Sequence, residues 1–190
     1  MAEEAAQAPL TINSQYVKDH SFENPNAPSI YGTMRKESPQ LNVNVEVTPS
    51  HLQGGIYEVT LGLRAEAKIG ETTAFLAEID YAAVVTIAEN LDEKVREQML
   101  MIEVPRFLFP FARAILADDT RDGGFPPLIM NPIDFGQMYL SRKMAQAGEG
   151  AGEATDEGAA SEDGDAGEQP ETAGDGKTAA DAGASANGQA

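Results

Sequence analysis

The chain has 190 residues, of which 42% are hydrophobic, contains no cysteine and carries a formal net charge of −18. This length predicts one folded domain of ordinary size, and the missing cysteines exclude disulfides, thiolate metal sites and catalytic thiols. The acidic balance disfavours binding to nucleic acids and anionic lipids, so we expect basic or apolar partners. No stretch has the apolar pattern of a signal peptide or a membrane span, and we expect a cytoplasmic protein.

The first half of the chain shows strand patterns in chain order. Residues 10–23 alternate weakly and change row midway, which indicates a strand with a bulge. Residues 24–32 (NPNAPSIYG) contain two prolines and predict a crossover loop. Residues 41–47 (LNVNVEV) alternate cleanly and predict a strand that ends at Pro49.

The longest alternating pattern, residues 56–87, predicts two strands joined by a tight turn. A three-residue loop at 70–72 would pair Leu63 with Ile79, so that apolar side chains face each other. The same register pairs Arg64 with Glu78 on the polar face. A two-residue loop would set Leu63 opposite Glu78 and mix the two rows, so we expect the three-residue loop.

One residue departs from this alternation. Leu76 lies in a polar row, flanked by Glu78 and Asp80. An apolar residue on an acidic face is either a contact for a partner or a single exposed leucine, which is common on protein surfaces. The pattern alone favours the single exposed leucine.

Helical spacing replaces alternation after residue 87. Residues 91–102 predict one helix, and Pro105 suits the first turn of a second helical stretch, which Pro110 is expected to bend or interrupt. Asn131 is expected to cap a last helix with Pro132 at its first position. The predicted fold is therefore α+β, with a four-stranded antiparallel sheet and helices on one face.

The predicted sheet has two open edges, and the helical segments 104–138 are unusually apolar for a monomer, so we expect an oligomer. Residues 145–190 contain no large apolar side chain and many acids, and are expected to be disordered. The expected organisation is a disordered N-terminus at 1–8, a folded domain at 9–144 and a disordered acidic tail at 145–190.

Signals for catalysis are weak. His20 and His51 stand in different contexts, without a second histidine at metal-ligand spacing, and are interpreted as surface residues. Asp19 and Glu23 have the chemistry of a general acid or base, but no pocket is predicted around them. We therefore expect no enzyme, no catalytic residue, no metal and no cofactor.

Three segments carry a family resemblance. Residues 16–28 (YVKDHSFENPNAP), 57–79 (YEVTLGLRAEAKIGETTAFLAEI) and 107–135 (FLFPFARAILADDTRDGGFPPLIMNPIDF) resemble SecB, a family of protein-export chaperones of Gram-negative bacteria. The resemblance implies a cytoplasmic homotetramer, a dimer of dimers with its helices between two sheets, which uses no nucleotide. Such a protein holds unfolded precursors of exported proteins and passes them to the motor ATPase SecA, without entering the membrane.

The resemblance also assigns roles to residues. In the family, an acidic sheet face docks the basic, zinc-bearing C-terminal tail of SecA, and the matching residues here are Asp19, Glu23, Leu76 and Glu78. The interpretation of Leu76 therefore changes from a single exposed leucine to a partner contact.

Two further sets follow from the resemblance. The family's client grooves run between the crossover loop and the last helix, and the candidate groove residues here are Tyr31, Met34, Phe125, Leu128 and Tyr139. The row associated with oligomer integrity matches Phe75, Ala77, Ile79 and Tyr81. Each of these residues is also suited to plain core packing.

Two alternatives remain open at this point. One is a general holdase of the same fold that does not dock SecA. The other is an antiparallel-sheet protein that binds a small ligand or substrate, which requires a pocket with convergent polar groups.

Overall fold

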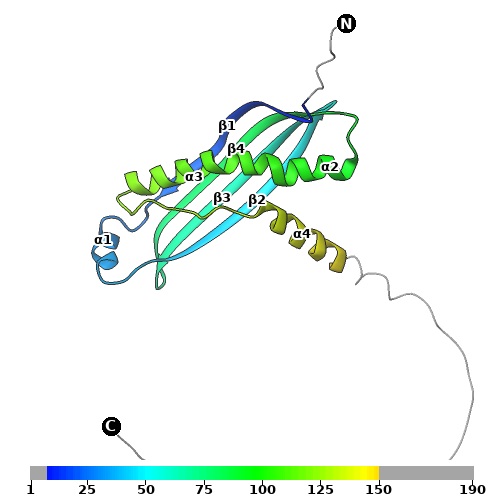
Figure 1. Cartoon of the computed structure of the whole chain (residues 1–190). Coiled ribbons are helices and arrows are strands. Elements are labelled where there is room, and N and C mark those ends of the chain that lie inside the picture. The colour runs from blue at the N-terminus through cyan, green and yellow to red at the C-terminus, as the bar shows by residue number, and fades with distance from the viewer. Residues whose placement is uncertain (1–7, 150–190) are drawn as a thin grey trace, which may run out of the picture. The chain divides into compact units, whose positions relative to one another are not determined.

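The computed structural model describes residues 8–149, with side chains described for 8–145, and confirms the predicted four-stranded antiparallel sheet (Figure 1). The strands are β1 (Leu10–Glu23), β2 (Gln40–Gln53), β3 (Ile56–Ile69) and β4 (Thr72–Ile87), in the order β1-β4-β3-β2. β1 and β2 are therefore the edge strands. The expectations for 1–7 and 150–190 concern segments outside the described residues.

The predicted register of β3 and β4 is confirmed, but the predicted loop length is wrong. Leu63 pairs with Ile79 and Arg64 with Glu78. The loop contains only Gly70 and Glu71. The pairing with β4 shifts by one residue between Ala67 and Lys68, and this shift makes the shorter loop compatible with the predicted register. A bulge thus absorbs one residue of β4, and Gly70 adopts the positive φ of 57° that the tight turn requires.

The edge strands show two further features. β1 has register shifts against β4 between Ile12 and Ser14 and between Val17 and Asp19, which confirms the predicted irregularity. β2 does not end at Pro49, as expected, but continues to Gln53. An edge strand tolerates proline where the missing N–H faces away from the neighbouring strand.

The helical elements are α1 (Ser29–Met34), α2 (Glu93–Gln98), η1 (Met99–Glu103), α3 (Val104–Asp122) and α4 (Phe135–Glu149), of which η1 is a π-helical turn. The expected break before Pro105 is this π turn, and the helical run continues through it into α3. α3 also continues past Pro110 as one helix. Within residues 8–149, no helix combines the length and apolar character needed to cross a membrane.

Two predicted boundaries are wrong. The crossover segment is not only a loop, because α1 forms within it and buries Ile30 at 2% exposure. The last helix begins at Phe135 rather than at Pro132, because the carboxylate of Asp134 caps it by accepting a hydrogen bond from the backbone N–H of Gln137 (3.0 Å). α4 then runs to Glu149.

α3 lies along one face of the sheet, here called the covered face (Figure 1). Its side chains at four-residue spacing, Val104, Leu108, Ala112 and Leu116, are fully buried where the helix packs on β3 and β4. The opposite side of the sheet, the open face, carries the polar rows of the strands, and no helix of the described residues covers it.

Candidate functional site

The structure brings the four predicted docking residues together on the open face. Glu23 on β1 pairs directly with Leu76 on β4, and Asp19 pairs with Asp80. Glu78 lies on β4 between Leu76 and Asp80, on the same face, because side chains two apart along a strand point the same way. The four residues therefore form one patch over two neighbouring strands.

Ion pairs neutralise part of the charge on the open face. Arg64 Nε lies 3.4 Å from Glu78 Oε1, and both side chains are about half exposed. Glu58 accepts hydrogen bonds from Lys18 and from the hydroxyl of Tyr16. The hydrogen bond from Lys18, followed by that from Tyr16, holds the pKa of the Glu58 carboxyl below its usual value.

An apolar hollow of about 170 Å³ lies on the covered side of the sheet, at the crossover end. It gathers three of the predicted groove residues, Met34, Phe125 and Leu128. Leu41 on β2 and Ile129 also line it, and Ile129 is 83% exposed. An exposed isoleucine beside an apolar hollow forms a surface suited to binding apolar side chains of another chain.

An aromatic cluster forms the floor of this hollow. The ring of Phe125 lies 5.0 Å from Phe75, 5.5 Å from Tyr31 and 6.4 Å from Phe22, between ring centroids. Tyr31 donates a hydrogen bond from its hydroxyl to the carbonyl of Gly123 (2.8 Å). The predicted groove residue Tyr31 therefore supports the hollow from behind and fastens the crossover segment to the end of α3.

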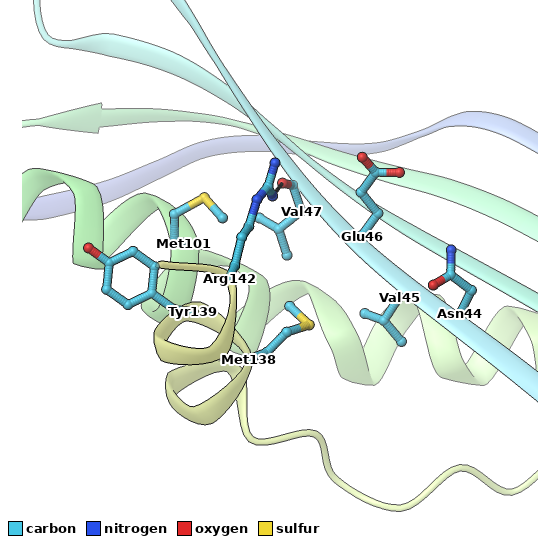
Figure 2. A pocket seen from close by; sticks show the side chains of 8 residues that line it. All are labelled: Asn44, Val45, Glu46, Val47, Met101, Met138, Tyr139 and Arg142. Atoms are coloured by element: carbon cyan, nitrogen blue, oxygen red, sulfur yellow. Dashed lines mark hydrogen bonds between the residues drawn. The ribbon is translucent and has the colours of Figure 1, made fainter. Parts of the chain in front are cut away.

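Tyr139 lies apart from the other groove residues, in a second hollow of about 210 Å³ between α4 and β2 (Figure 2). Residues 44–47 of β2, Met101 and Met138 complete its walls. Arg142 also lines it and donates a hydrogen bond to the carbonyl of Val47 (3.2 Å). β2 lines both hollows, because Leu41 reaches the first and Val45 the second.

The end of α4 makes an ion pair with α2. Lys143 Nζ lies 2.7 Å from Glu97 Oε2 on α2, and this hydrogen bond lowers the pKa of the Glu97 carboxyl. Lys143 also lies over the ring of Tyr139, with Nζ 5.3 Å from its centroid. Both partners of the ion pair are solvent-exposed, so its contribution to stability is small.

The row assigned to oligomer integrity is mostly core. Phe75, Ala77 and Ile79 are buried within the single chain. Tyr81 is only partly buried and stacks on Phe111 of α3, with ring centroids 6.1 Å apart. Phe111 is itself 52% exposed, so this part of the covered face presents aromatic surface to solvent.

The histidines have structural partners. His20 Nε2 lies 2.6 Å from Asp119 Oδ2, which ties β1 to α3, and His51 Nε2 lies 2.8 Å from the carbonyl of Gly54. Within residues 8–149, no three His, Cys, Asp or Glu side chains are placed to hold a metal ion.

Sequence reasoning missed several residues around the hollows, namely Leu41, Ile129, Met101 and Met138. The segment FPPLIM (125–130) holds the only available signal, because its two prolines keep it out of a helix and its apolar side chains then face outward in part. Leu41 reads as a regular strand position, and nothing in the alternation marks it as a lining residue.

Comparison with known proteins gives consistent matches. Residues 3–146 match the family model of SecB, described as preprotein translocase subunit SecB. The protein-export protein SecB of Rhodospirillum rubrum is 49% identical over 149 residues, which cover 78% of this chain and 91% of that protein. The protein-export protein SecB 1 of Gluconobacter oxydans is 46% identical over 156 residues, covering 77% of this chain and 89% of that protein.

A solved structure shares the fold. The Mycobacterium tuberculosis Rv1957 SecB-like chaperone, solved in complex with a ChAD peptide from the Rv1956 HigA1 antitoxin, superposes with a TM-score of 0.53 at 14% identity. The match covers 66% of this chain and 88% of that chain.

Proposed function

Because this chain belongs to the SecB family of protein-export chaperones, we propose that it holds unfolded precursors of exported proteins without ATP and delivers them to the motor ATPase SecA. Members of this family are not enzymes, which confirms the prediction that the chain has no catalytic role. The observation that carries the proposal is the pairing of two surfaces on one sheet: an acidic open face, and on the other side an apolar hollow and a second hollow of mixed polarity.

Holding of precursors rests on the two hollows along β2. An unfolded chain exposes several apolar segments, and two neighbouring hollows bind two of them at once. Several weak sites raise the overall affinity through effective concentration, without demanding a particular sequence. Methionines at Met34, Met101 and Met138 suit this role, because their flexible side chains adapt to varied partners.

Docking of SecA rests on the open face. Asp19, Glu23 and Glu78 attract the basic, zinc-bearing tail that the resemblance assigns to SecA, and Leu76 offers an apolar contact among them. Charge complementarity of this kind steers the encounter and fixes the orientation of the partner.

A homotetramer, arranged as a dimer of dimers in the cytoplasm, completes the proposal. Phe107 and Phe111 on α3 are each more than half exposed, and Tyr81 stacks on Phe111. An apolar helix face of this kind is covered when a second copy packs on it. The chaperone domain is proposed to cover residues 9–144, with the acidic tail at 145–190 as a soluble extension.

The groove role is tested by Ile129→Asp. The substitution is expected to lower the affinity for an unfolded exported precursor roughly tenfold, because the bound precursor would bury a charged side chain in place of the apolar side chain of Ile129. The measurement is the concentration of chain that slows refolding of the precursor by half, without nucleotide. The thermal midpoint should be unchanged, because Ile129 is exposed.

Leu52→Asp is the matched control, because Leu52 is also exposed but lies at the far end of β2, outside both hollows. The Leu52→Asp chain should slow refolding of the precursor at the same concentration as the unsubstituted chain. Equal losses for the two variants would contradict a groove at Ile129.

A small-ligand carrier is less well supported. The hollows of about 170 and 210 Å³ are smaller than the ~300–1,000 Å³ typical of ligand pockets. A larger hollow, about 710 Å³ at the sheet end near Gly55 and Glu89, is lined by no aromatic side chain. A general holdase that does not dock SecA differs from the proposal only at the open face, and SecA binding decides between them.

A further inference from the structure

One continuous segment supplies much of the lining of the apolar hollow at the crossover end. Residues 125–129 all line this hollow, just after the turn that ends α3. We call residues 125–130 the groove segment. It lies outside the helices and strands, with Phe125, Leu128 and Met130 buried and the residues between them exposed. Its path must therefore be fixed by interactions other than those of regular secondary structure.

Thr120 holds the groove segment through two hydrogen bonds. The backbone carbonyl of Thr120 accepts one from the backbone N–H of Phe125 (2.9 Å), and its side-chain hydroxyl accepts one from the backbone N–H of Leu128 (2.9 Å). Pro126 and Pro127 lie between these two donors and have no N–H of their own. One residue in the last turn of α3 thus fixes the segment on both sides of its two prolines.

The surroundings of Thr120 commit its hydroxyl to this contact. Thr120 is 0% exposed and is the one polar residue that is buried among residues 8–145. Its hydroxyl donates back into α3, where it lies 3.1 Å from the carbonyl oxygens of both Leu116 and Ala117. Because the single hydroxyl proton points to the helix, the oxygen is free to accept from Leu128. A buried N–H is costly to leave without an acceptor, so this path of the segment requires the hydroxyl.

Arg113 holds the other end of the groove segment. It donates a hydrogen bond from Nη1 to the carbonyl of Met130 (3.1 Å), and its guanidinium lies over the ring of Phe109, 5.6 Å from the centroid. Both ends of the segment are therefore attached to the same helix, α3. Between these attachments, Ile129 is held at 83% exposure beside the hollow.

We propose that Thr120 is a positioning residue for precursor binding, because its hydroxyl fixes the path of the groove segment and so presents Ile129 and the hollow to an apolar side chain of the precursor. Thr120 is itself fully buried and acts only through the segment. Holding the segment in its binding conformation in advance raises affinity, since less freedom is lost on binding. The proposal rests on the proposed holding of unfolded precursors at this hollow.

The test compares Thr120→Val with Thr120→Ser in the full-length chain. The measurement is the concentration of chain that slows refolding of an unfolded exported precursor by half, without nucleotide and well below the thermal midpoint of every variant. Thr120→Val keeps the shape of the side chain but removes the hydroxyl, and is expected to raise this concentration roughly 3- to 10-fold. Thr120→Ser keeps the hydroxyl and should stay within about twofold of the unsubstituted chain.

Thr60→Val is the matched control. It makes the same substitution in the polar row of β3, at a residue that lines neither of the two hollows along β2. The Thr60→Val chain should slow refolding of the precursor at the same concentration as the unsubstituted chain.

Amide hydrogen exchange distinguishes positioning from a general loss of stability. The amide of Leu128 should exchange faster in Thr120→Val, while Thr120→Ser keeps its protection. Both variants are expected to lower the thermal midpoint, because valine leaves a buried N–H without an acceptor and serine leaves a small void. Only the valine variant should lose holding, so a purely structural role of Thr120 does not produce the expected pattern. Unchanged exchange at Leu128 in Thr120→Val would contradict the positioning role.

Two further outcomes overturn the proposal. Equal loss of holding in Thr120→Val and Thr120→Ser would assign the effect to packing rather than to the hydroxyl. If Thr120→Val holds precursors normally and Ile129→Asp does not, Thr120 has no positioning role and the holding proposal stands. If Ile129→Asp also holds them normally, the hollow is not a precursor site, and the role of Thr120 is refuted together with it.

Discussion

Replacing Glu78 with lysine is expected to lower the affinity for SecA by at least ~100-fold while leaving the holding of unfolded precursors unchanged. The substitution reverses a charge in the centre of the docking patch and places a cation beside Arg64. Like charges brought together at an interface cost several kcal/mol, and ~1.4 kcal/mol corresponds to a tenfold change in affinity. The two hollows lie on the other side of the sheet, and Glu78 lines neither of them.

Surface plasmon resonance with immobilised SecA measures the affinity for SecA, and inhibition of precursor refolding measures the holding of unfolded precursors. Glu71→Lys is the control, because it makes the same charge reversal at the exposed turn next to β4. Its SecA affinity should stay within about twofold of the unsubstituted chain, as expected for a rim charge. If Glu78→Lys loses precursor holding and SecA binding together, in a chain with unchanged mass, the two surfaces are not separate.

Replacing Phe125 with alanine is expected to lower the free energy of unfolding by about 3–5 kcal/mol. Phe125 is 5% exposed and contacts three other aromatic rings, those of Phe22, Tyr31 and Phe75. Its loss leaves a cavity at the junction of β1, β4 and the crossover segment. Urea unfolding at one fixed chain concentration measures the effect.

Phe111→Ala is the matched control for the loss of unfolding free energy expected of Phe125→Ala. Phe111 is 52% exposed and, among the side chains of residues 8–145, its ring stacks only on Tyr81, so the fold of each chain should persist while the proposed assembly across α3 weakens. The expected result is a lower mass by light scattering with an unchanged circular dichroism spectrum. A Phe111→Ala chain that keeps the tetrameric mass would show that the exposed face of α3 is not the assembly interface.

Strand pairing could be predicted where alternation was strong. The rows of β3 and β4 fix Leu63 opposite Ile79, because any one-residue slip would exchange a buried row for a polar one. The turn could not be predicted equally well, since a bulge near Ala67 satisfies the same register with a shorter loop. The residues of the turn permit both a three-residue loop and a two-residue loop with a bulge. The strand pairing beyond the turn is the same in both cases and does not distinguish them.

Helix boundaries depended on interactions that sequence patterns do not contain. Asn131 and Asp134 are both good capping residues, and only the geometry of the preceding segment selects Asp134. α1 forms in a proline-containing stretch because Ile30 is buried in the core, which outweighs the local preference for a loop.

The candidate surfaces were predicted unequally. Leu76 and Glu78 share a face by alternation alone, but placing Glu23 opposite Leu76 requires the β1–β4 register with its two shifts. Tyr139 was expected beside Phe125, yet α4 carries it to a separate hollow, because the position of α4 is set by contacts distant in sequence.

Static light scattering of the purified chain, alone and mixed with an unfolded exported precursor in the absence of nucleotide, tests the chaperone proposal most directly. The expected result is a particle of about four chain masses of 20.2 kDa each, which gains the mass of a precursor when one is added. A particle of one chain mass that takes up no precursor would contradict both the assembly and the holding function.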